Sequence, residues 1–210
     1  MTTTLRGLPP GRAGMPWLAR RRAVAARGSD LLERKLRILR AEEQDYALRA
    51  ERTAAAWEQA CGELERWMLR SALLSGERAV RLATDGADAV AEIDWRLTMG
   101  VRYPADATCA LPAQLGGFSP DNTALHHAAA AARSAVQAGV DHAVATAALA
   151  AIRAEIDSTR RQLRALEQRW LPRLESARAH LVIQLDDLEH DEHVRLRWAA
   201  DSARTGRTRR

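Results

Sequence analysis

Two histidines near the C-terminal end of the chain have a spacing that suits metal binding. His190 and His193 stand three residues apart in LEHDEH, with Asp191 and Glu192 between them. Residues three apart share one face of a helix, and imidazole and carboxylate groups are ligands for zinc. No third ligand stands at a matching spacing elsewhere in the sequence. The preferred interpretation is therefore a solvated polar helix face, with no metal bound.

Other signatures of catalysis are missing from the sequence. It contains no P-loop, no GxGxxG, no GxSxG and no HExxH motif. Its two cysteines, Cys61 and Cys109, form no CxxC pair, which argues against both a zinc site and a disulfide framework and fits a reducing cytosol. We expect a protein that is not an enzyme, with no catalytic residues and no cofactor.

Positive charge is concentrated at the two ends of the chain. The net charge is +5; residues 1–28 hold six arginines and no acid, and residues 203–210 hold four more arginines. A basic protein raises nucleic acid or an acidic membrane surface as a partner. However, the arginines at 20–22 spread around most of a helix circumference. Basic ends indicate either an electrostatic contact made by both termini or solvated tails, and give little support for nucleic acid.

No membrane-spanning segment is expected. The alanine-rich run 128–152 is interrupted by Arg133, Gln137, Asp141 and His142. The amino-terminal residues lack an apolar stretch followed by a cleavage site.

The composition favours an all-α fold. Hydrophobic residues make up 47% of the chain, yet Phe occurs once and Tyr twice, while Ala, Leu, Arg and Glu dominate. After an N-terminal arm (1–13), apolar residues at alternating steps of four and three predict a coiled-coil helix over 14–84. Its seam consists of Leu32, Leu36, Leu39, Glu43, Tyr46, Ala50, Thr53, Trp57, Ala60 and Leu64.

The middle segment, 85–121, has a different character. Apolar and polar residues alternate from Ile93 to Val101, then PAD and ATCALPA follow. This pattern predicts a β-hairpin that turns at Pro104-Ala105-Asp106, followed by a loop rich in Gly, Ser and Pro.

A second coiled-coil helix is predicted over 122–200, before a basic tail (201–210). Its seam keeps seven-residue spacing from Leu149 to Trp170 and then changes to eleven-residue spacing at Leu174, Ala177, Leu181, Leu185, Leu188 and Glu192. Pro172 stands where the spacing changes. Since the seam resumes at once, we expect the helix to continue through Pro172 with a kink or local unwinding.

The two helices must bury their seams, and the nearest partner is each other. We therefore predict a long antiparallel two-helix coiled coil with a short β-hairpin module between the helices. A fold-back near residue 105 sets Gly28 near Val182, Leu36 to Leu39 near Pro172, and Trp17 near Trp198. In this register Gly28 serves close helix contact, and Trp57 and Trp170 lie in the core.

Two stretches resemble the D-subunit family of V-type and archaeal-type rotary ATPases. The first is LPPGRAGMPWLARRRAVAARGSDLLERK, and the second begins TRRQLRALEQRWLPRLES and ends EHVRLR. The first matches the family signature at Pro10, Arg12, Leu18, Arg21, Ala25, Gly28, Leu31, Leu32 and Lys35. The second matches it at Thr159, Arg160, Arg161, Ala165, Leu166, Glu167, Pro172, Arg173, Leu174, Glu175, Glu192, Val194, Arg195 and Leu196.

The resemblance implies a non-catalytic rotor subunit of the central stalk, in the soluble sector of the complex on the cytoplasmic side of the membrane. Its partners would be the ATPase A and B subunits of the head, the F subunit, and the subunit that joins the stalk to the membrane rotor ring, with no nucleic acid and no insertion into the membrane. Its candidate partner contacts are Arg12, Arg21, Gly28, Lys35, Arg160, Arg161, Glu167, Pro172, Arg173, Glu192 and Arg195. A coiled-coil scaffold or tether without a rotary role is the alternative.

Overall fold

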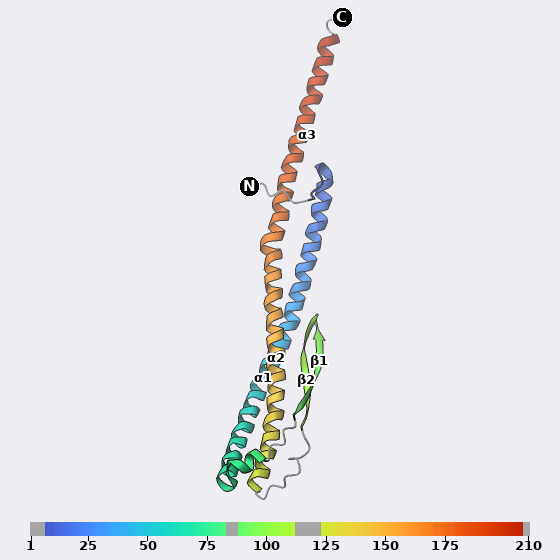
Figure 1. The fold of residues 1–210 in the computed structure, drawn as a ribbon. Coiled ribbons are helices and arrows are strands. Elements are labelled where there is room, and N and C mark those ends of the chain that lie inside the picture. The colour runs from blue at the N-terminus through green and yellow to red at the C-terminus, as the bar shows by residue number, and fades with distance from the viewer. Residues whose placement is uncertain (1–6, 83–87, 112–122, 208–210) are drawn as a thin grey trace. The chain divides into compact units, whose positions relative to one another are not determined.

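The fold consists of long helices and one β-hairpin. The computed structural model describes residues 7–82, 88–111 and 123–207. In chain order the elements are a 3₁₀ turn η1 (Gly11–Ala13), helix α1 (Gly14–Leu82), strands β1 (Val90–Thr98) and β2 (Val101–Ala110), helix α2 (Thr123–Ala165), a π-helical turn η2 (Leu166–Trp170) and helix α3 (Leu171–Arg207) (Figure 1). The predicted fold class, two long helical segments with a hairpin between them, is confirmed.

The chain divides into two compact units, and α1 contributes to both. Unit 1 comprises Met1–Arg34 and Thr159–Arg210, and unit 2 comprises Lys35–Ser158.

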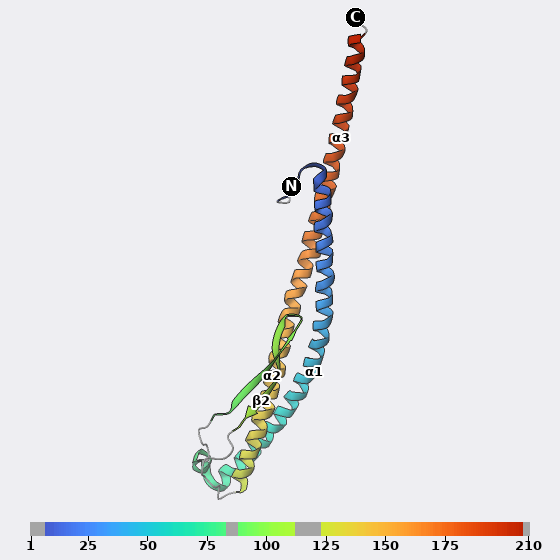
Figure 2. The same ribbon diagram turned by 90° about the vertical axis from the view of Figure 1, so that its right-hand side faces the viewer.

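In unit 1 the first turns of α1 lie beside η2 and α3 (Figure 2). Leu18 and Ala25 of α1 pack on Leu174 and Leu181 of α3, and all four are buried. Further apolar residues of the predicted seam are partly buried around this cluster, among them Leu166, Trp170, Ala177 and Leu185. The eleven-residue spacing therefore corresponds to a packed helix face as far as Leu185.

The seam prediction is wrong beyond Leu185. Leu188 is 56% exposed and Glu192 is also exposed. The reason is that α1 begins at Gly14, which lies against Leu181. Within unit 1, α3 thus continues well past the start of α1, which leaves its last turns without a helix beside them (Figure 1).

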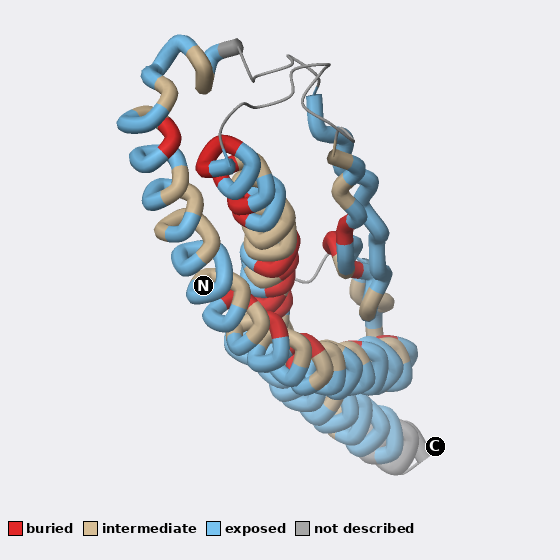
Figure 3. The backbone as a smooth tube through the Cα atoms, turned by 90° about the horizontal axis from the view of Figure 1, so that it is seen from below, coloured by how far each residue is buried: buried red, intermediate tan, exposed pale blue. Residues whose placement is uncertain are grey.

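In unit 2 the rest of α1 pairs with α2. The heptad seam of α1 is buried at Leu36, Leu39, Tyr46 and Ala50. The facing stripe of α2 is rich in small residues, which lets helices approach closely, and it consists of Ala128, Ala131, Ala135, Val144, Ala145, Ala148, Ile152 and Ile156 (Figure 3). Trp57 lies at the edge of this seam, 41% exposed.

The predicted antiparallel register is wrong. Gly28 lies beside Leu166, not Val182, a difference of about four helical turns. The helices do not fold back symmetrically about the hairpin: Trp67 stacks on His127 near the start of α2, so the last part of α1 extends past the beginning of α2. The expected pairing of Trp17 with Trp198 fails for the same reason, since Trp17 packs in the unit 1 core and Trp198 is 75% exposed.

The hairpin exists, but its turn is not at Pro104-Ala105-Asp106. The strands pair antiparallel with Thr98 opposite Val101, and the two turn residues, Met99 and Gly100, have φ angles of 51° and 83°. Two residues with positive φ match the twist of a hairpin. Pro104 instead lies in β2 opposite Trp95, next to an irregularity in the register, where a missing backbone N–H is tolerated.

One helical run has the length and composition of a membrane span. The segment from Thr123 to Ala200 contains an 18-residue window with a mean hydropathy of 1.3, of which 28% is buried. One such run is weak evidence of a membrane span, because the test rests on length and composition alone.

Candidate functional site

The helix passes through Pro172 by widening for one turn. Directly before the proline, the backbone N–H of Leu171 donates to the carbonyl oxygen of Leu166, five residues back, in the π-helical turn η2. A proline in a helix has no N–H to donate, and its ring presses on the carbonyl four residues earlier, here that of Gln168. A π turn gives that carbonyl more room. The predicted local unwinding at Pro172 is confirmed.

One of the two α1 glycines in unit 1 lies close against α3. A Cβ on Gly28 would meet Leu166 Cδ1 at 3.9 Å, which is ordinary van der Waals distance. Gly28 therefore does not serve the close helix contact that was predicted for it. The tight position is Gly14, where a Cβ would lie 2.7 Å from Leu181 Cδ2 and 2.8 Å from the carbonyl oxygen of Pro9.

Two ion pairs join α3 to the N-terminal residues of unit 1. Arg12 Nη2 lies 2.7 Å from Glu189 Oε1, and Arg22 Nη2 lies 3.4 Å from Glu175 Oε1. All four side chains are more than half exposed, so each pair contributes about 0–1 kcal/mol to stability. The pairs matter chiefly because they show which carboxylates of α3 already have a partner within unit 1.

The remaining candidate contacts of unit 1 lie on the outside of the helices. Arg21 places its guanidinium 4.8 Å from the centre of the Trp17 ring. Arg160 is half-buried, and the others are exposed along the end of α2, η2 and α3: Arg161, Glu167, Pro172, Arg173, Glu192 and Arg195. These residues do not converge on one point, so they form a surface and not a catalytic centre.

Lys35 lies apart from the other candidates, in unit 2. Its Nζ donates to Glu155 Oε1, and the two side chains are 22% and 32% exposed. Further along α1, Glu43 accepts a hydrogen bond of 2.9 Å from Arg153 Nε. Both pairs join α1 to α2, so Lys35 is a contact within the helix pair.

Sequence reasoning missed Arg169. It lies in η2, one turn before Arg173, and both arginines line a groove of about 580 Å³ on unit 1. The spacing of four between two arginines, which places both on one helix face, is the signal that would have found it.

In unit 2 the hairpin is held to α1 by polar contacts. Arg49 donates to the carbonyl oxygen of Ala105 at 2.7 Å and to Asp106 Oδ1 at 3.2 Å. The Tyr103 hydroxyl donates to Glu42 Oε2 at 3.2 Å, and its ring meets that of Tyr46 edge to face at 5.3 Å. Burial, and next the nearby Tyr103, raise the pKa of Tyr46 above its ordinary value.

Strand β1 leaves several large apolar side chains uncovered. Every residue of β1 from Val90 to Leu97 is exposed, including Ile93 at 47%, Trp95 at 52% and Leu97 at 70%. Arg102 stacks its guanidinium over the Trp95 ring at 4.6 Å.

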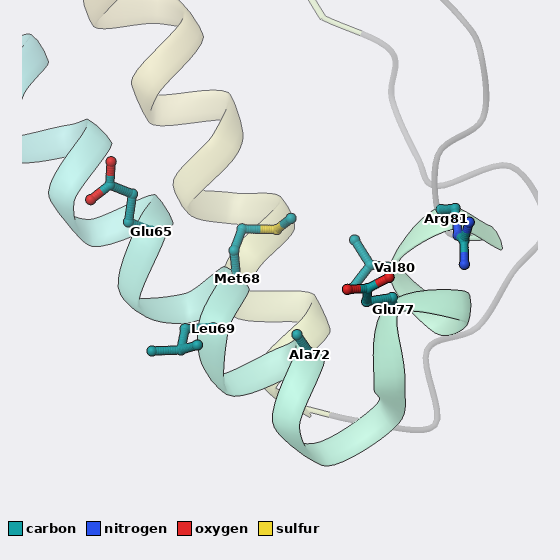
Figure 4. A pocket seen from close by; sticks show the side chains of 7 residues that line it. All are labelled: Glu65, Met68, Leu69, Ala72, Glu77, Val80 and Arg81. Atoms are coloured by element: carbon teal, nitrogen blue, oxygen red, sulfur yellow. The ribbon is translucent and has the colours of Figure 1, made fainter.

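The C-terminal part of α1 turns back at Gly76, whose φ of 75° and ψ of 161° are not helical. Residues on both sides of this kink, among them Met68, Leu69, Ala72 and Val80, line a groove of about 530 Å³ (Figure 4). Just before the kink, Leu73 and Leu74 are 78% and 71% exposed. This end of unit 2 therefore presents apolar side chains to its surroundings.

No group of three His, Cys, Asp or Glu side chains within residues 7–82, 88–111 and 123–207 is arranged to hold a metal ion. His190 and His193 lie exposed on α3.

Comparison with known proteins places this arrangement in a family. Residues 17–201 match the family of the ATP synthase D subunit. The chain is 33% identical over 195 residues to the V-type ATP synthase D subunit of Anaeromyxobacter sp. (strain K), which covers 89% of this chain and 92% of the relative. It is 25% identical over 197 residues to the A-type ATP synthase D subunit of Methanobrevibacter smithii, which covers 91% of this chain and 85% of the relative. The chain belongs to the ATP synthase D-subunit family, whose members are components of V/A-type rotary ATPases.

Proposed function

We propose that this chain is the non-catalytic central-stalk shaft of a V/A-type ATPase, which transmits torque between the A/B head and the membrane rotor ring. The observation that carries the proposal is a family match over residues 17–201 that coincides with two long helical segments. A pair of long packed helices resists bending, and a shaft must resist bending to carry torque.

Unit 1 is the part that enters the head. It holds all the candidate contacts except Lys35, together with the α3 turns that continue past the start of α1. Its surface changes along the helix: arginines dominate from Arg160 to Arg178, and carboxylates from Asp186 to Glu192. The π turn at Pro172 makes the shaft asymmetric, so its rotation presents a different surface to each A/B interface in turn.

Unit 2 carries the other partners. The exposed apolar groove and leucines beside the Gly76 kink support docking on the subunit that joins the stalk to the rotor ring. The uncovered apolar side of β1 supports the binding of the F subunit to the middle of the chain.

The chain is held at the membrane by its partners and lies on the cytoplasmic side. The apolar stripe of α2 packs on α1, which supports a role for that stripe in the helix pair and not in a lipid bilayer. Nucleic acid has no part in this function.

A scaffold or tether is the competing function. It would use the same helix pair and would bind partners, but it would have no effect on coupling. Replacing both Arg160 and Arg161 by alanine separates the two functions in a reconstituted complex. A coupling shaft loses ions transported per ATP or fails to assemble, and unchanged transport per ATP with normal assembly would favour the tether.

A further inference from the structure

Strand β1 has an open edge along its whole length. Among the described residues the hairpin is a two-stranded sheet, so β1 pairs with β2 on one edge only. Every residue from Val90 to Leu97 is exposed, whereas β2 is buried at Val101, Tyr103 and Pro104. Strand β2 therefore holds the hairpin on unit 2, and the other edge of β1 is open to a partner.

The open edge is regular. The extra residue at the register irregularity, Ala105, belongs to β2, so the nine residues of β1 run without a bulge. The strand contains no proline or lysine, which together with bulges usually keep an edge strand from pairing. Its charged residues, Glu92, Asp94 and Arg96, are of both signs. A strand with matching charges can therefore add to this edge.

The turn determines which backbone groups reach the open edge. Thr98 and Val101 close the two-residue turn, so the backbone N–H and C=O groups of Thr98 point toward β2. Those of Leu97, and two residues further back those of Trp95, point to the open edge. In an antiparallel pair, residues whose backbone groups point to the partner lie opposite one another. Trp95 can therefore lie opposite Trp95 of a second copy.

A second copy of β1 fits the edge best in this register. With the two Trp95 residues opposite each other, Asp94 meets Arg96 and Ile93 meets Leu97, each pair occurring twice by symmetry. Opposite charges and apolar side chains placed directly opposite each other stabilise a sheet. Sliding the copy by two residues sets Asp94 opposite Asp94 in one direction and Arg96 opposite Arg96 in the other. Like charges disfavour both of these registers.

Asp94 has no cation beside it in its own hairpin. It lies opposite Asp106, whose carboxylate accepts a hydrogen bond from Arg49. Within the part of the chain that the structure describes, neither Asp94 nor Arg96 makes an ion pair. Two carboxylates opposite each other are unfavourable, and Arg96 of a second copy would offset them.

We propose that β1 of the free chain pairs edge to edge with β1 of a second copy, so that two two-stranded hairpins form one antiparallel sheet centred on Trp95. The inference goes beyond the proposed function. One rotation axis holds one shaft, so the pairing belongs to the chain before it joins a complex. It covers the open edge and the apolar residues of β1 until other partners are met.

Charge reversals on β1 test the pairing. We would prepare the full chain as parent, Asp94→Arg, Arg96→Asp, and the control Glu92→Arg. The control changes the charge by the same amount as Asp94→Arg, but in the proposed register Glu92 lies opposite the neutral Thr98. Sedimentation velocity over a wide range of protein concentration measures dimer formation, after circular dichroism has shown equal helix content. Asp94→Asn, also expected to dimerise more weakly than the parent, is the second variant if a reversal disturbs the hairpin.

The parent chain and the control are expected to dimerise alike. Each reversal at Asp94 or Arg96 should weaken the dimer at least about tenfold, because it sets like charges opposite each other twice. An equimolar mixture of Asp94→Arg and Arg96→Asp should dimerise again, since both central pairs of the mixed dimer then carry opposite charges.

A parent chain that stays monomeric at every concentration would overturn the pairing and leave the proposed function standing. A dimer that survives both reversals, or one that the mixture fails to restore, would overturn the register. A monomeric parent chain that binds the isolated F subunit, with affinity lost in Asp94→Arg and kept in Glu92→Arg, would overturn the second copy as the occupant of this edge.

Discussion

The backbone N–H of Leu171 reaches the carbonyl of Leu166, five residues back, in the turn before Pro172. This widened turn lets one helical run continue from Thr123 to Arg207 although a proline lies inside it. We regard it as a built feature of the shaft, since proline costs about 3 kcal/mol in an ordinary helix interior.

Replacing Pro172 by alanine should therefore stabilise the chain. Alanine restores the missing N–H and removes the pressure on the Gln168 carbonyl, and we expect a gain of about 1–3 kcal/mol in the free energy of unfolding. Urea denaturation measures it, with Ser176→Ala, one turn further on, as a control expected to change little. A loss of stability in Pro172→Ala would show that the π turn is preferred for reasons other than the proline.

Gly14→Ala should destabilise unit 1. Gly14 has helical backbone angles, φ −64° and ψ −32°, so alanine suits the conformation and the effect is steric. The new methyl would press on Leu181 and on the Pro9 carbonyl, at a cost of about 1–3 kcal/mol. Gly62→Ala is the matched control, because it has open space and should stabilise by about 0.5–1 kcal/mol. Equal effects at the two sites would contradict the tight packing at Gly14.

Arg49→Ala should release the hairpin from α1. It removes the hydrogen bonds to Ala105 and Asp106, worth about 1–2 kcal/mol together. Hydrogen exchange of the β1 and β2 amides should become faster, with little change in the α3 amides. Arg52→Ala, an exposed neighbour on α1, is the control. Unchanged exchange in the hairpin would mean that Tyr103 and its partners hold it without help.

Tyr46 should make unit 2 sensitive to alkaline pH. Its pKa is raised, so the folded chain retains the phenol proton to higher pH than the unfolded chain does. The corresponding stability is complete below the ordinary pKa of 10.0 and is lost as the pH rises through the raised value. The free energy of unfolding, measured below and above that pKa, should fall in the parent chain as the pH rises. It should fall less in Tyr46→Phe. The same fall in both proteins would assign the effect to another group.

The spacing of apolar residues predicted the helices, because each helix of a pair buries one face and the residues of that face recur at a regular spacing in the sequence. Leu36, Leu39 and Ile152 are buried where the heptad pattern placed them, and the resumed seam after Pro172 correctly predicted a continuous helix. The register was not predictable in this way. A heptad slip changes which residues meet but leaves the pattern intact, and the actual register depends on where α2 begins relative to the kink at Gly76.

The position of the hairpin turn and the partners of the ion pairs could not be predicted from the sequence pattern either. Pro104-Ala105-Asp106 carries a stronger turn signal than Met99-Gly100, because methionine rarely adopts the positive φ of 51° that it has here. The pairs Arg12–Glu189 and Arg22–Glu175 follow from the register. Sequence reasoning therefore named Arg12 as a contact but not Arg22, and it did not predict which acid each arginine meets. Arg169 differs from these cases, because its spacing of four from Arg173 is a signal that the sequence does carry.

Rotation of the chain inside the head is the most direct test of the central claim. Cys61 and Cys109 would be replaced by serine, and a single cysteine at Glu65, exposed on α1 in unit 2, would carry a bead. With the A/B head fixed to a surface, ATP should drive unidirectional rotation of the bead. A bead that stays still while the assembled head hydrolyses ATP would contradict the account and favour a tether.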